Sequence, residues 1–136
     1  TEIPQECALA QAVRWALEIA PTIKDYRQAR QAVDERFAGM HLVHTINNAC
    51  VVAAALLHGG HDFGRIITIA VMGGLDTDCN GATAGSIAGV MLGRGAIPGA
   101  WTEPFNDTLH TAIAGRNVVR ISDLVAETVD LARPPA

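Results

Sequence analysis

Residues 73–93 read GGLDTDCNGATAGSIAGVMLG, and this stretch decides how the chain is interpreted. From residue 81 onward a glycine recurs at every fourth position, which places the glycines near one face of a helix. Four glycines in a helix cost about 1 kcal/mol each relative to alanine, so close contact with a neighbouring helix must offset that cost. The pattern predicts a tightly packed helix over 81–92, with residues 73–79 as a loop and Asn80 as the helix cap.

The rest of the chain shows helical periodicity and no convincing strand alternation. Apolar residues recur at three- and four-residue spacing, as they do on amphipathic or buried helices. Proline or glycine follows several of these runs and marks their ends. Further helices are predicted over residues 5–20, 25–38, 45–58, 62–72 (with Asp62 as cap) and 105–114. A last helix is predicted from Ser122 or Asp123 to the prolines at 134 and 135. The sequence therefore predicts the all-α class, without repeats or linkers.

Composition and charge limit the possible functions. The net charge is −4 and the Lys and Arg residues are scattered, so we expect no nucleic-acid or membrane partner. Two stretches without charged residues, 45–60 and 79–93, are shorter than the about 20 residues of a membrane span. Three cysteines are an odd, sparse set that does not form a disulfide framework. We therefore expect a cytoplasmic protein.

The segment Asp76-Thr77-Asp78 carries the clearest chemical signal. In an extended loop, carboxylates two residues apart point the same way and offer hard oxygen ligands to Mg²⁺ or Mn²⁺. A buried carboxylate needs a partner, and no Lys or Arg occurs between Arg65 and Arg94. The alternative is that the two aspartates and Asn80 only cap a helix, and their spacing alone does not separate the two interpretations.

A longer pattern surrounds this segment. Residues 44–93 read HTINNACVVAAALLHGGHDFGRIITIAVMGGLDTDCNGATAGSIAGVMLG, and IPGAW follows at 97–101. A helix ending in glycines, then DxD, a small-residue helix and a loop with Ile-Pro and Trp form a specific combination. Over about residues 40–102 the chain resembles the C-terminal core of the ADP-ribosylglycohydrolase family. The resemblance implies a compact orthogonal helical bundle with a dinuclear Mg²⁺ centre, for which Mn²⁺ is an alternative cation.

The resemblance also implies metal ligands. In the family both aspartates of the DxD motif bind metal, which assigns that role to Asp76 and Asp78. The next position is usually Thr or Ser and also binds metal, but in this sequence it is Cys79. Because a thiol is a poor ligand of Mg²⁺, the Asn80 side chain or the backbone is an alternative source of a carbonyl oxygen.

Three polar residues are candidates for substrate binding. His44 and Asn48 lie one helical turn apart at the polar start of the predicted helix 45–58, and Asn80 follows the DxD motif. Members of this branch of the family have a similar HxxxN pattern, so these side chains are expected near the ribose. The alternative is that they satisfy the helix start and the nearby loop.

The resemblance implies an enzyme. Family members remove ADP-ribose from modified side chains or related acceptors, so we expect a Mg²⁺-dependent hydrolase acting on ADP-ribosylated protein or a small ADP-ribosyl compound. One alternative is an inactive binding or structural protein, because the same fold occurs in lens crystallins. Another is a hydrolase of a different phosphorylated riboside.

Family domains also have an N-terminal half, which carries a further cluster of metal ligands and an acidic catalytic residue. Neither feature is found in this sequence. Residues 1–136 are therefore expected to form the C-terminal part of the domain, and the general acid/base is not assigned. The missing half, or a second copy of the chain, is the expected partner.

Overall fold

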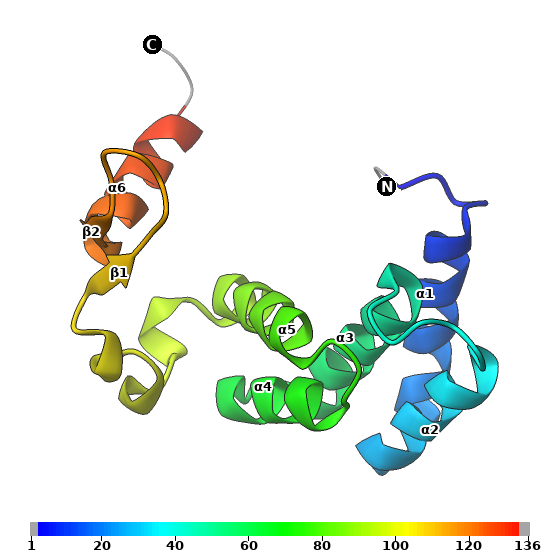
Figure 1. The fold of residues 1–136 in the computed structure, drawn as a ribbon. Helices are drawn as coiled ribbons and strands as arrows, with labels where there is room; N and C mark the ends of the chain where they lie inside the picture. The colour runs from blue at the N-terminus through cyan, green and yellow to red at the C-terminus, as the bar shows by residue number, and fades with distance from the viewer. Residues whose placement is uncertain (1–2, 134–136) are drawn as a thin grey trace. The chain divides into compact units, whose positions relative to one another are not determined.

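The computed structural model describes residues 3–133, which divide into two compact units between Ile97 and Pro98. The described residues of the first unit form α1 (Ala8–Ile19), η1 (Ala20–Thr22), α2 (Tyr26–Arg36), α3 (Thr45–Gly59), α4 (Phe63–Met72), α5 (Thr77–Leu92) and η2 (Arg94–Ala96) (Figure 1). Those of the second unit form η3 (Gly99–Trp101), η4 (Glu103–Phe105), β1 (Thr108–His110), β2 (Val118–Arg120) and α6 (Ile121–Ala132). Helices dominate, so the all-α prediction is confirmed.

Most predicted helices of the first unit occur where the periodicity placed them, and polar caps fix where some of them begin. The Asp62 carboxylate accepts a hydrogen bond from the backbone N–H of Arg65 at 2.9 Å, so its predicted role as the cap of α4 is confirmed. The Asp25 carboxylate caps α2 in the same way, through the N–H of Arg27. Each cap satisfies a backbone donor that has no partner within the helix.

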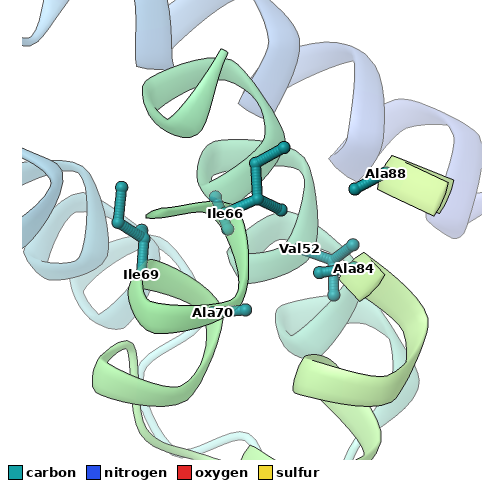
Figure 2. Close-up of a cluster of buried hydrophobic side chains, with 7 residues drawn as sticks. Val52, Ile66, Ile69, Ala70, Ala84 and Ala88 are labelled. Carbon is teal, nitrogen blue, oxygen red and sulfur yellow. The ribbon is translucent and has the colours of Figure 1, made fainter. Parts of the chain in front are cut away.

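The helix α3 is buried on most sides, as its apolar sequence predicts, and it contacts α1, α2, α4 and α5. Figure 2 shows part of the core that it shares with α4 and α5. That cluster consists of Val52, Ala55, Ile66, Ile69, Ala70, Ala84 and Ala88. Burial of a side chain such as Ile66, which is fully buried, stabilises the fold by about 1.5–3 kcal/mol. None of the helices within residues 3–133 combines the length and the apolar character needed to cross a membrane.

The glycines of α5 allow the close helix contact that their spacing predicts. A Cβ atom built on Gly81 lies 3.0 Å from Val71 Cγ2, and one built on Gly85 lies 3.4 Å from Ile67 Cδ1. Both contacts are with α4, so the two helices pack closely where larger residues would push them apart. The packing of α4 against α5 holds the start of α5 in place.

The predicted helix over residues 105–114 is wrong, and so is the expectation that the chain has no strand. Thr108–His110 and Val118–Arg120 form an antiparallel pair with Leu109 opposite Val119. Asn106 and Asp107 have φ values of 45° and 53°, in the left-handed region, which interrupts any helix there. Strands of three residues are too short to produce a recognisable alternation. The prolines expected to end the last helix lie outside the described residues.

Candidate metal centre

The helix α5 begins at Thr77, and Asp76 is its N-cap residue. The prediction of a loop through Cys79 with Asn80 as cap is therefore wrong. The backbone N–H of Asn80 donates to the Asp76 carbonyl at 2.9 Å, which is a helical hydrogen bond. Leu75, directly before the cap, has a φ of 60°, in the left-handed region. Asp78 consequently lies in the first helical turn, where the helix dipole favours negative charge.

Three potential metal ligands gather at this helix start. One carboxylate oxygen each from Asp76 and Asp78 and the Cys79 sulfur all lie within 4.8 Å of one another. Asp76 is half-buried, whereas Asp78 and Cys79 are exposed. The Asp76 carboxylate makes no capping hydrogen bond, and none of the ion pairs formed within residues 3–133 includes either aspartate. The cluster therefore presents carboxylates that no protein cation neutralises in the described part of the chain.

The Asp76 carboxyl influences the pKa values of its two neighbours in the cluster. A hydrogen bond with Asp76 holds the pKa of Asp78 below its usual value, and the backbone N–H groups of Asp78 and Cys79 lower that pKa further. The pKa of the Cys79 thiol is raised, first by a hydrogen bond to Asp76 and then by the negative charge of that carboxylate. Asp78 is therefore ionised at neutral pH, which is the form that binds a cation.

The Asn48 side chain connects the start of α5 to α3. Its Oδ1 atom accepts hydrogen bonds from the backbone N–H of Asp76 at 3.1 Å and from Asn80 Nδ2 at 2.7 Å. Its Nδ2 atom donates to the carbonyls of Leu42 at 2.8 Å and His44 at 2.9 Å. Asn48 and Asn80 are 8% and 3% exposed. These contacts match the helix-start alternative for both asparagines, and their contact with substrate stays a prediction.

His44 is the N-cap residue of α3. Its Nδ1 atom accepts a hydrogen bond from the backbone N–H of Ile46 at 3.2 Å, and the side chain is exposed. Because the His44 carbonyl accepts from Asn48, the residue lies close to the candidate centre in space. The imidazole therefore combines a capping role with access to solvent, and its predicted contact with ribose remains a prediction.

Sequence reasoning missed one residue that supports the centre. Arg30 of α2 donates from Nε to the carbonyl of Gly73, in the segment directly before Asp76, and also pairs with Asp34. This contact joins residues that are 43 positions apart. The only local signal was the spacing of Arg30 and Asp34, which is common on exposed helices and does not point to a distant carbonyl.

The cluster of Asp76, Asp78 and Cys79 lies away from a pocket of the first unit. That pocket has a volume of about 260 Å³ and is lined by Ala20, Pro21, Ile23, Leu57 and His58. Leu57 and His58 are at the C-terminal end of α3, whereas Asn48, which holds Asp76, is near its start. The rise of an α-helix separates Asn48 and His58 by about 15 Å along the axis. The pocket is therefore not part of the candidate metal centre.

Fold and site together define a helical protein with an acidic candidate cation site at a helix N-terminus. The family model of ADP-ribosylglycohydrolase matches residues 2–133, so the chain belongs to the ADP-ribosylglycohydrolase family. The match extends the resemblance seen over about residues 40–102 to nearly the whole chain. No curated protein and no solved structure matches the chain. Family membership indicates hydrolase activity toward ADP-ribosyl compounds.

The residues of the cluster fit a divalent cation in part. The two carboxylates are the hard oxygen ligands that Mg²⁺ and Mn²⁺ prefer, and Asp78 is ionised and exposed. The Cys79 sulfur is not a ligand that Mg²⁺ prefers. Asn80, the alternative oxygen ligand, is buried and directs its amide nitrogen at Asn48. The centre therefore offers two suitable oxygen ligands and one sulfur.

Proposed function

We propose that this chain is a metal-dependent hydrolase that cleaves ADP-ribose from ADP-ribosylated protein or from a related small ADP-ribosyl compound. The cluster of Asp76, Asp78 and Cys79 carries this proposal, because its ligand atoms lie within 4.8 Å of one another. The absence of any ion pair to the two aspartates within residues 3–133 supports it. Family membership indicates the class of substrate.

Asp76 and Asp78 would hold the cation, and Cys79 is the third candidate ligand, for a cation that accepts sulfur. The expected occupants are two Mg²⁺ ions, with Mn²⁺ as the alternative. When bound, such a cation supplies a Lewis acid that stabilises negative charge near the ribose. Asn48 keeps the Asp76 backbone in place, and the exposed imidazole of His44 would contact a sugar hydroxyl. Asn80 is the third candidate for substrate contact, through the start of α5.

The centre needs further groups, because Mg²⁺ prefers six oxygen ligands. We propose that water, substrate and a second protein segment provide them, and that the segment is the N-terminal half of the family domain or a second copy of this chain. Exposed apolar side chains on α4 and α5 support a contact with such a segment, since Met72 and Val90 are 63% and 89% exposed. The general acid/base residue would come from that segment.

Release of ADP-ribose tests the proposal. The 136-residue chain and the variants Asp78→Asn and Asp123→Asn are compared with Mg²⁺ or with a chelator, on ADP-ribosylated protein and on small ADP-ribosyl compounds. Asp123→Asn is the matched control because it also removes an exposed aspartate from the first turn of a helix, α6. We expect release that needs Mg²⁺ and that falls at least about a hundredfold in Asp78→Asn only.

Two results would contradict the proposal. Equal release by Asp78→Asn and the unmodified chain would show that Asp78 has no role in the reaction. No release by any of the three chains, with Mg²⁺ present, would rule out a second copy of this chain as the source of the general acid/base, and would contradict hydrolysis by this chain without a further segment. Circular dichroism of each variant checks that the helices remain folded.

A further inference from the structure

Cys79 places a free thiol beside the two candidate carboxylates. It is exposed, whereas Cys50 is buried and donates to the Ala12 carbonyl, and Cys7 is half-buried and caps α1. Among the described cysteines, Cys79 is therefore the one that shares a cluster with acidic side chains. Solvent and dissolved ions reach its sulfur directly.

The geometry allows all three side chains to hold one ion. In a tetrahedral site, two atoms bound to one Zn²⁺ at about 2.0 and 2.3 Å lie about 3.5 Å apart. The three candidate ligand atoms already lie within 4.8 Å of one another, so modest side-chain rotations bring them into range. Asp78 and Cys79 are exposed, which leaves room for such rotations.

The chemistry of the donors differs from that of an all-oxygen site. Thiolate ligands favour Zn²⁺ and other thiophilic cations, and carboxylates bind these cations as well. Two carboxylates, one thiolate and an open position form a set of three protein ligands, as catalytic zinc sites have. Mg²⁺ gains little from sulfur and holds its water tightly.

We infer that Cys79 makes this centre select a thiophilic divalent cation, such as Zn²⁺ or Co²⁺, in preference to Mg²⁺. The inference rests on the proposed function, since it concerns the cation held by Asp76 and Asp78. Binding replaces the S–H bond of Cys79 with a metal–sulfur bond and releases one proton to the buffer.

Cobalt absorption and competition calorimetry test the inference. Co²⁺ is added to the 136-residue chain, to Cys79→Ser and to Cys7→Ser, and the near-ultraviolet charge-transfer band from thiolate to cobalt is recorded. Cys7→Ser is the matched control, because it removes another accessible thiol and serine caps a helix well. We expect the band in the unmodified chain and in Cys7→Ser, and its loss in Cys79→Ser.

Calorimetry then compares Zn²⁺ with Mg²⁺. We expect Cys79→Ser to lower the affinity for Zn²⁺ at least about tenfold. The affinity for Mg²⁺ should change by less than about threefold, because only Zn²⁺ uses the sulfur. A cobalt band that persists in Cys79→Ser, or an equal affinity of both chains for Zn²⁺, overturns the inference.

The same titrations separate this inference from the proposed function. Mg²⁺ and Zn²⁺ could both bind and both need Asp78, while Cys79→Ser binds each cation as tightly as the unmodified chain does. In that case the proposed cation site is supported and the inferred role of Cys79 in selectivity is wrong. If Asp78→Asn binds both cations as the unmodified chain does, the proposed cation site itself is wrong.

Discussion

Asn48 is a single side chain on which the position of the DxD motif depends. Its carboxamide uses both polar atoms, accepting from Asp76 and Asn80 and donating to two carbonyls before α3. It is almost fully buried, so no water replaces these bonds if the amide is removed. Its role is to position the first candidate ligand, and the distance of Asp76 from Asp78 depends on it.

Asn48→Ala should therefore destabilise the fold. It leaves the buried Asn80 amide, the half-buried Asp76 N–H and the Leu42 carbonyl without their Asn48 partner, and each buried group left in this way costs about 1–3 kcal/mol. We expect the free energy of unfolding, measured by urea denaturation, to fall by about 2–4 kcal/mol. The control is Asn117→Ala, which changes an exposed asparagine and should leave the free energy of unfolding nearly unchanged. A loss in Asn48→Ala that equals the control would show that these hydrogen bonds do not hold the helices together.

Cys50 should make the stability of the fold depend on pH in the alkaline range. Burial raises the pKa of Cys50 to about 11, and the nearby Arg36 charge opposes part of that effect. Because the folded pKa is above the unfolded value, the stability from Cys50 is fully present below pH 9.0 and is lost as pH rises toward 11. Between about pH 8 and 10.5 the unmodified chain should lose about 2 kcal/mol more than Cys50→Ala in urea denaturation. An equal loss of unfolding free energy in both chains would contradict a raised pKa for Cys50.

At the scale of helices, the periodicity predicted α1 to α4 because each has apolar residues at regular helical spacing or an apolar run bounded by glycine or proline. It misplaced the start of α5, because Asp76, Asp78 and Asn80 are all good N-cap residues and local sequence does not choose among them. The choice is made by the hydrogen bond from the Asp76 N–H to Asn48, which lies 28 residues earlier. The β1–β2 hairpin was missed because its strands are too short to show a pattern.

Two glycines test the helix packing. An added Cβ at Gly59 lies 2.8 and 2.9 Å from the backbone Cα and N atoms of Ile66, so α3 and α4 would have to separate. Gly59→Ala should cost about 1–3 kcal/mol or more. Gly89→Ala is the matched control, because its Cβ meets Ile97 at an ordinary 3.8 Å and alanine favours helix by about 1 kcal/mol. Thermal denaturation compares the two, and equal melting temperatures would contradict the packing described.

At the scale of the whole molecule, the described buried residues all lie between Ala12 and Ala88, within the first unit. The candidate metal ligands lie in that unit as well. Composition and periodicity predicted the all-α class, and the motif around Asp76 predicted the family. The hydrogen bonds from Asn48 and Arg30 could not be predicted, since they join segments that are far apart in the sequence.

A shortened chain that ends at Ile97 should therefore keep its helices and its cation binding. The first unit contains its own core, so the second unit is not needed to position Asp76 and Asp78. Far-ultraviolet circular dichroism and Mg²⁺ calorimetry on residues 1–97 measure both properties. An unfolded spectrum, or cation binding that needs residues 98–136, would show that the second unit contributes to the centre.

The cation site is tested most directly by calorimetric titration of the 136-residue chain with Mg²⁺ and Mn²⁺, beside Asp78→Asn and Asp123→Asn. We predict saturable binding to the unmodified chain and to Asp123→Asn, and a loss of at least about tenfold in affinity for Asp78→Asn. Binding of both cations to Asp78→Asn with unchanged affinity, or no binding to any of the three chains, would contradict the cation site at the start of α5.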